Sequence, residues 1–455
     1  MLQLQKRILQ LAWPIMLSNI TVPLLGLVDT AVLGHLSEVS YLGGVALGGQ
    51  VVTLLLWSFG FLRMGTTALS AHAIGASEVR SQLSNPLDGS NHHASIERVL
   101  QNALLMALFI SLPLMLFAFL TLENIISLIG GSETIQVLAV EYASIRLGAT
   151  PAVLIQYVLI GWFIGRGETK VPLILLIASN SLNALLDVIL VYGYGLTSDG
   201  VAWATLCADY FAASLGLYWA YRKVTEGQKD NKISFKWPRW QELKPLININ
   251  HQLFIRTLCL LSVFVFFTAK GAQQGDLVLA VNAIMLTLLL LISNALDGFA
   301  HAAESLVGQS LGAKNFRQLR QGIWLTGANA LMIALIMVVG FAWQGNNLMA
   351  LLTNQQDVLA MAMEYSLWLI WLPLIGCSSY WLDGVFIGMQ ASAQMRNSML
   401  LAACTVFLPV WFLTQELANH GLWLAFYSFL LARSIFMLPA FLSILNKHQL
   451  FAEKN

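Results

Sequence analysis

The chain has 455 residues, of which 57% are hydrophobic and only 10% are charged, whereas soluble domains contain roughly 25% charged residues. This composition excludes a soluble enzyme and a disordered chain. The 24 basic and 23 acidic residues nearly balance, which excludes a nucleic-acid-binding protein. The sequence therefore predicts an all-α integral membrane protein with many spans.

Apolar stretches long enough to cross a membrane occur along the whole chain, since a spanning helix needs about 20 such residues. Twelve spans are predicted, at 8–34, 42–74, 98–120, 135–165, 171–193, 200–222, 246–269, 278–310, 319–344, 358–388, 398–416 and 421–445. Several are longer than the membrane requires, and prolines such as Pro14 and Pro373 lie inside them. We therefore expect bent or tilted helices.

Basic residues are unevenly distributed between the two sets of connecting loops. The loops after odd-numbered spans contain one, Lys270, whereas the other loops, the span ends that adjoin them and the chain ends contain nineteen. Because positively charged loops remain in the cytoplasm, both termini are predicted to be cytoplasmic. The longest basic connection, 223–245, predicts a cytoplasmic linker between an N-lobe (1–222, helices 1–6) and a C-lobe (246–455, helices 7–12).

The two predicted lobes contain an internal repeat. Residues 161–165 (GWFIG) recur 223 positions later at 384–388 (GVFIG), and Gly75–Ala76 recurs as Gly312–Ala313. Because six spans lie on each side of the linker, both repeats have the same topology. We expect two six-helix bundles related by a pseudo-two-fold axis along the membrane normal, with a substrate cleft between them.

Ten charged residues lie inside the predicted spans, where a charge is costly. Six are acidic and four are basic: Asp29, Asp187, Asp209, Asp297, Glu304 and Asp383, with Arg63, Arg146, Arg256 and Arg433. Internal ion pairing that fixes helix packing is one interpretation. Since four arginines cannot neutralise six carboxylates one to one, at least two acids must be protonated, bind a cation or face water. This surplus predicts ion-coupled transport.

Polar residues follow one face of the predicted span 171–193. Asn180, Asn183 and Asp187 have helical spacing, and Asp29 lies at a similar predicted depth. Carboxylate and amide oxygens in an apolar setting favour binding of a proton or a hard monovalent cation. Interhelical hydrogen bonding is the alternative role for the two asparagines.

A second polar group is predicted in the C-lobe. Asp297, His301 and Glu304 share a face of the span 278–310, while Asp383 lies beside the repeated glycines and has Arg256 as a candidate partner. We expect a polar packing network here. A second coupling or substrate site is the alternative.

Four segments resemble the multidrug and toxic compound extrusion (MATE) family, in particular its DNA-damage-inducible-F branch. They are 183–187 (NALLD), 296–300 (LDGFA), 304–309 (ESLVGQ) and 382–388 (LDGVFIG). The resemblance extends over nearly the whole chain. It implies a monomeric antiporter of the bacterial inner membrane, without a cofactor, that exports lipophilic or cationic compounds in exchange for H⁺ or, alternatively, Na⁺.

The resemblance also implies where the coupling ion binds. The N-lobe site would comprise Asp29, Tyr142, Asn183, Asp187 and Thr205, with Asn180 nearby. A Na⁺ ion would be held by Asp29, Asn183, Asp187 and Thr205, and Pro14 would be the bend point of the first helix. A C-lobe sodium site is not expected, because the sodium-coupled branch has an acid on span seven where this chain has Arg256.

The sequence also bears on three other functions. A lipid-linked oligosaccharide flippase of the same superfamily would need cationic residues for a pyrophosphate headgroup, and Arg63, Arg146 and Arg256 are candidates. A membrane enzyme such as a prenyltransferase is disfavoured because no Asp-rich metal motif occurs. The chain also lacks a Walker A motif, which disfavours an ATP-driven pump.

Overall fold

The computed structural model is almost entirely helical in its described residues, as the composition predicts. It describes residues 1–34, 39–83, 90–226, 237–353 and 355–452, except for the side chains of 20–34, 39, 80–83, 90–95 and 447–452. The chain forms two compact units. We name Leu17–Ile247 the N-unit, and Met1–Met16 with Asn248–Asn455 the C-unit.

The order of the helices matches the twelve predicted spans. Within the described ranges ten helices are long and apolar enough to cross a membrane, and a helix pair bent by 51° brings the number to eleven. This pair is α5 (Glu133–Leu147) and α6 (Thr150–Arg166), and the first span is α1 (Leu2–Gly34). The predicted all-α membrane fold is therefore confirmed.

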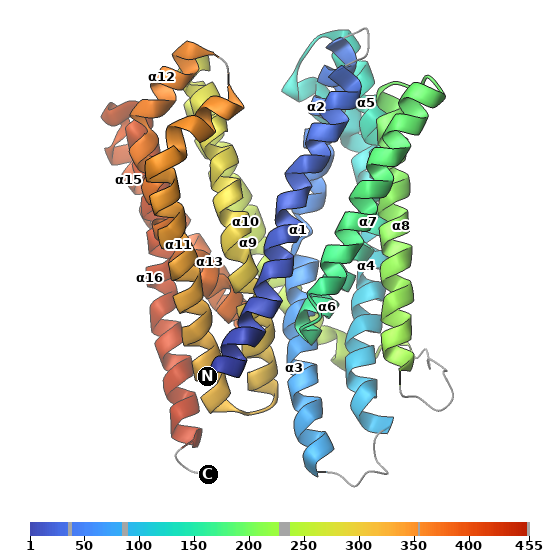
Figure 1. The fold of residues 1–455 in the computed structure, drawn as a ribbon, viewed down its shortest axis with the longest axis vertical. Helices are drawn as coiled ribbons and strands as arrows, with labels where there is room; N and C mark the ends of the chain where they lie inside the picture. The colour runs from blue at the N-terminus through green and yellow to red at the C-terminus, as the bar shows by residue number, and fades with distance from the viewer. Residues whose placement is uncertain (35–38, 84–89, 227–236, 354, 453–455) are drawn as a thin grey trace. The chain divides into compact units, whose positions relative to one another are not determined.

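The N-unit is built from the second half of α1 and the helices up to α8 (Figure 1). Besides α5 and α6, they are α2 (Val39–Trp57), α3 (Phe61–Leu83), α4 (Ser90–Ile129), α7 (Lys170–Asp187), the π-helical turn η2 (Val188–Gly193) and α8 (Ser198–Thr225). Local signals set several helix ends. The Ser132 hydroxyl accepts a hydrogen bond from the Ile135 backbone N–H at the start of α5, and Gly167, with a φ of 79°, ends α6.

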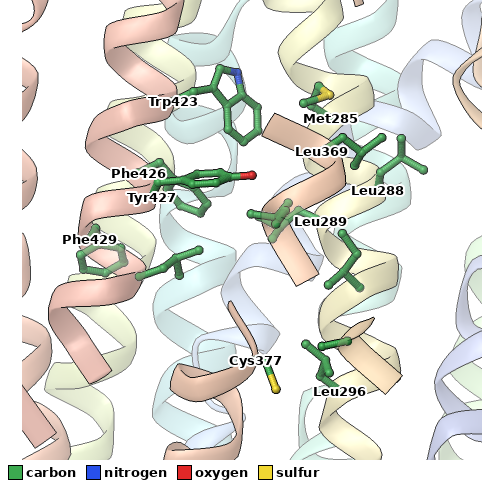
Figure 2. Packing of buried hydrophobic residues seen from close by; sticks show 14 of the residues in the cluster. Met285, Leu288, Leu289, Leu296, Leu369, Cys377, Trp423, Phe426, Tyr427 and Phe429 are labelled. Carbon is green, nitrogen blue, oxygen red and sulfur yellow. The ribbon is translucent and has the colours of Figure 1, made fainter. Parts of the chain in front are cut away.

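Besides the first half of α1, the C-unit contains the remaining helices around one large apolar core, with α9 belonging to it from Asn248 onward. They are α9 (Trp240–Ala272), α10 (Asp276–Gly312), α11 (Phe316–Leu352), α12 (Gln356–Glu364), α13 (Ser366–Gly388), α14 (Ser392–Leu401), η3 (Ala402–Phe407), α15 (Leu408–Leu413), η4 (Gln415–Leu417) and α16 (Ala418–Ala452). Figure 2 shows Trp423 and Phe426 of α16 on the side facing Met285 and Leu288 of α10, within that core. These aromatic and aliphatic side chains hold the helices together by close packing.

The repeated glycines make equivalent helix contacts in the two units. Gly161 of α6 packs against the backbone of Arg63 in α3, and Gly384 of α13 packs against the backbone of Ala300 in α10. A Cβ atom at either glycine would overlap the opposing carbonyl oxygen, so only glycine permits this approach. Arg63 and Ala300 are 237 residues apart, the same offset as Gly75 and Gly312. The sequence repeat is therefore a repeat of backbone packing.

The units differ from the predicted lobes at the start of the chain. The N-lobe was predicted to begin at residue 1, but Met1–Met16 group with the C-unit. Ile8, Leu11 and Ala12 are buried in the C-unit core, and the side-chain amides of Gln5 and Asn329 form two reciprocal hydrogen bonds of 2.8 and 3.2 Å. The apolar and amide contacts explain why the first half of α1 belongs to the C-unit.

The predicted bend at Pro14 stays a prediction. Helix α1 is assigned without a break from Leu2 to Gly34. The boundary between the two units falls after Met16, two residues beyond this proline.

Candidate functional site

Three of the predicted coupling residues lie together inside the N-unit. Asp187 and Asn183 of α7 are 0% and 1% exposed, and Thr205 of the adjacent helix α8 is 8% exposed. The α7 residues are four positions apart, which places them on one helix face. The Asn183 side-chain amide lies 3.0 Å from the Thr205 hydroxyl and 3.1 Å from Oδ2 of Asp187. The amide therefore lies between a titratable carboxyl group and a hydroxyl group.

Two orientations of the Asn183 amide give two different hydrogen-bond arrangements. In one, Nδ2 donates to the Thr205 hydroxyl, which in turn donates to the Val201 carbonyl at 2.9 Å. After a half-turn, Nδ2 donates to Oδ2 of Asp187, and Oδ1 accepts from the Thr205 hydroxyl and its backbone N–H. The second arrangement satisfies all the neighbouring groups and suits an ionised Asp187, which can only accept. The first places Nδ2 3.2 Å from the Thr205 backbone N–H, a donor facing a donor, and therefore requires a protonated Asp187 that donates to the amide oxygen in compensation.

Of the other predicted N-lobe residues, the structure describes the side chains of Tyr142 and Asn180 but not that of Asp29. Tyr142 on α5 is buried and packs with Val191 and Val201, beside Gly48 of α2. Asn180 lies one turn before Asn183 on α7 and is half-buried. The side chain of Asp29 is outside the described residues, although its backbone is part of α1.

The acids inside the spans differ in how many arginines they pair with. In the N-unit, Arg146 donates to Oδ2 of Asp209 at 2.8 Å, and Gln156 donates to Oδ1 of the same carboxylate at 3.3 Å. Asp209 is therefore part of an interhelical ion pair. Three further acids lie within the bounds of the predicted spans, and all three are exposed: Glu141, Glu364 and Glu416.

In the C-unit two arginines converge on one acid. Oδ2 of Asp383 on α13 accepts from Arg256 of α9 and, at 2.6 Å, from Arg433 of α16. Arg256 is the partner expected from the sequence, whereas the role of Arg433 follows only from the packing of α13 against α16. All three residues are buried: Arg256 is 5% exposed, Arg433 is 2% exposed and Asp383 is 9% exposed.

The acids of α10 form a separate group. Nδ1 of His301 lies 2.9 Å from Oε1 of Glu304, and both residues are buried. Asp297 is half-buried and lies within electrostatic range of Tyr380 on α13. The predicted C-lobe residues thus divide into an Asp383 cluster and a His301–Glu304 pair.

The N-unit residues have the donor types that a hard cation needs. Asp187, Asn183 and Thr205 can supply carboxylate, carbonyl and hydroxyl oxygens. Within the described part of the chain, no group of three or more His, Cys, Asp or Glu side chains could hold a metal ion. The described donors therefore fit a proton or a monovalent cation better than a transition metal.

Comparison with known proteins agrees with this architecture. The MatE family model matches residues 14–82, 87–189 and 253–413. The chain is 37% identical to DNA damage-inducible protein F of Escherichia coli (strain K12), over 94% of this chain and 90% of the relative. It is 21% identical to the multidrug export protein MepA of Staphylococcus aureus (strain MSSA476), over 96% and 93% of the two chains.

The fold also matches a solved structure. A crystal structure of a MATE protein in the bent conformation superimposes with a TM-score of 0.83 at 20% identity, covering 98% of each chain. Members of this family are transporters and not enzymes. The family-model match and the 37% identity together establish that the chain belongs to the MatE family of membrane transporters.

Proposed function

We propose that the chain is a monomeric antiporter that exports lipophilic or cationic compounds from the cytoplasm in exchange for protons. The names of relatives such as the multidrug export protein MepA support this class of substrate. The bias of one basic residue against nineteen supports cytoplasmic termini in a bacterial inner membrane. In that orientation a charge moving inward across 100 mV supplies about 2.3 kcal/mol.

The observation that carries the proposal is the position of the Asn183 amide between Asp187 and Thr205. When Asp187 is ionised, the amide donates to the carboxylate and accepts from Thr205. When Asp187 takes up a proton, it donates to the amide oxygen, Nδ2 turns to Thr205, and the Thr205 hydroxyl donates to the Val201 carbonyl instead. A proton on α7 therefore changes the hydrogen bonds of α8.

This exchange can drive transport only through a difference in proton affinity between two conformations. The spacing of α7 and α8 would favour the protonated arrangement in one conformation. That conformation binds the proton more tightly, so its population rises when Asp187 is protonated. We propose that Asp29 shares this proton and that α1 bends near Pro14 in the switch. Na⁺ held by Asp29, Asn183, Asp187 and Thr205 is the alternative coupling ion.

The test is ethidium transport by purified protein in liposomes, with an imposed pH gradient or an imposed sodium gradient. Asp187→Asn should lower efflux driven by the pH gradient by about tenfold or more, because each 1.4 kcal/mol of lost differential affinity is a factor of ten. Glu141→Gln, which removes an exposed carboxylate of the same unit, should transport like wild type. If a sodium gradient drives efflux and a pH gradient does not, the coupling ion is Na⁺ and not H⁺. Efflux at the wild-type rate in Asp187→Asn would refute the coupling site.

The hydroxyl of Thr205 is tested separately by a matched pair of variants. Thr205→Ser keeps the hydroxyl and should retain coupling, whereas Thr205→Val keeps the shape and removes the hydroxyl. We expect only the valine variant to lose its response to the pH gradient.

A further inference from the structure

The helix that carries Asp187 ends in a turn of unusual geometry. Helix α7 is α-helical up to Asp187, and the next six residues, Val188–Gly193, form the π-helical turn η2. At its end the N–H of Tyr194 donates to the carbonyl of Ile189, five positions earlier, at 3.1 Å. Such turns are rare and frequently lie at functional sites. Here the turn begins at the residue after the carboxylate of the coupling site.

The turn η2 contributes one buried side chain to the N-unit. Of its six residues only Val191 is buried, at 3% exposure. Val191 packs with Tyr142 of α5 and with Val201 near the start of α8. The connection from η2 to α8 is short, since it consists of residues 194–197. The packing of Val191 therefore holds the first turn of α8 against the end of α7.

These contacts close a ring around the coupling site. The backbone carbonyl of Val201 accepts a hydrogen bond from the Thr205 hydroxyl at 2.9 Å. Thr205 lies 3.0 Å from the Asn183 amide, which lies 3.1 Å from Oδ2 of Asp187. From Asp187 the chain continues directly into η2, where Val191 packs back onto Val201. A displacement of Val191 would therefore move α8, and with it the Thr205 hydroxyl, relative to Asp187.

We propose that Val191 is a positioning residue of the coupling site. Through η2 it holds α8 at the distance from α7 at which Asn183 can bridge Asp187 and Thr205. Val191 is apolar and offers the coupling ion no ligand, so it acts on ion affinity through the spacing of hydrogen-bonding groups, whose interactions weaken steeply when their geometry is disturbed. This inference rests on the function proposed for the site and holds for either coupling ion.

The contact of the Val191 side chain is tested by substitution. Val191→Ala removes most of the contact, whereas Val191→Ile keeps a branched side chain of similar shape. Val224→Ala is the matched control, since Val224 is buried at 6% exposure on the same helix α8 and lies about 35 Å along the helix from Val201. These variants retain every polar group of the coupling site.

The π-helical geometry is tested by deletion of one residue from the turn. Ile189 is 40% exposed, and its deletion leaves η2 one residue short, so that the segment can close as an α-helix. Because each residue of an α-helix turns the chain by about 100°, the deletion changes the face on which Val191 lies relative to Asp187. Deletion of Cys404, an exposed residue of the π-helical turn η3 in the C-unit, is the control.

The ion affinity of the site can be measured without transport. Infrared difference spectra of the purified protein, recorded as the H⁺ or Na⁺ concentration is varied, should contain a carboxyl signal that is absent in Asp187→Asn. The midpoint of this signal should show an affinity about threefold or more weaker in Val191→Ala and in the Ile189 deletion, the change expected for one weakened hydrogen bond. Val191→Ile, Val224→Ala and the Cys404 deletion should keep the wild-type midpoint. The ion concentration for half-maximal ethidium efflux in liposomes should shift by the same factor.

Each outcome has a definite meaning. An unchanged or a tighter midpoint in Val191→Ala overturns the positioning role, and that variant decides the question if the Ile189 deletion does not fold. An equal loss of affinity in Val224→Ala or in the Cys404 deletion also overturns it, because the effect would then be one of general packing. If Asp187→Asn leaves the infrared spectrum unchanged, the coupling site and this inference both fail. If the midpoints shift as expected while neither gradient drives efflux by wild type, the proposed antiport fails and the positioning role is upheld.

Discussion

The Asp383 cluster should respond very unequally to removal of its acid or of one of its bases. Asp383→Asn leaves the guanidinium groups of Arg256 and Arg433 buried without a carboxylate. Uncompensated buried charge costs about 3–5 kcal/mol. Arg256→Met leaves Asp383 paired with Arg433 at 2.6 Å, so we expect a loss of about 1–2 kcal/mol, close to that of one hydrogen bond to a charged group.

Unfolding of the purified protein in mixed micelles by increasing amounts of SDS would measure these differences. Asp383→Asn should unfold at the lowest SDS fraction and Arg256→Met at an intermediate one. Asp209→Asn is a control in the N-unit, since its partner Arg146 is more exposed, with 15% of its side chain accessible against 6% for Arg256; it should cost less than Asp383→Asn. Equal losses for Asp383→Asn and Arg256→Met would refute the reasoning, because they would mean that one arginine cannot neutralise the carboxylate alone.

Two further predictions concern packing, measured by the same unfolding assay. Gly161→Ala and Gly384→Ala should each cost about 1–3 kcal/mol, since their Cβ atoms would overlap an opposing backbone. Gly340→Ala, with no atom within 4 Å of its Cβ, should be neutral or stabilising by up to about 1 kcal/mol; a loss there equal to the others would contradict the packing argument. Gln5→Leu should cost about 1–3 kcal/mol because it leaves the buried amide of Asn329 without that partner. The double variant with Asn329→Leu should recover most of this loss, and strict additivity in the double-mutant cycle would show that the pair does not hold α1.

The span pattern was predictable from sequence because a hydrophobic stretch of membrane length is a strong signal. The breaks inside spans were less visible. Residues 58–60 form a turn between α2 and α3 without a proline, so the sequence predicted one span. Pro151 lies inside the predicted span 135–165, where a proline favours a bend, and the structure places it in the first turn of α6, where proline is favoured. That position was a usable sign that a new helix starts there.

The candidate site was predictable where it depends on one helix and not where it depends on several. Helical spacing placed Asn183 and Asp187 on one face, whereas the pairing of Arg433 with Asp383 required knowledge of how α16 packs on α13. The sequence also could not predict that Met1–Met16 belong to the C-unit. Apolar residues such as Ile8 and Leu11 indicate that a segment is buried, but not which helices it packs against.

The two halves of the chain share their backbone contacts but not their buried charges. Gly161 and Gly384 make the same close approach to a neighbouring helix, yet Asp383 corresponds to Ile160 and Glu304 to Thr67 at the offsets of the repeat. Close helix packing requires small residues at fixed positions, which the repeat retains, whereas ionisable groups only need a partner or a proton nearby. Because the buried charges do not follow the repeat, an ion-binding site in one unit does not imply an equivalent site in the other.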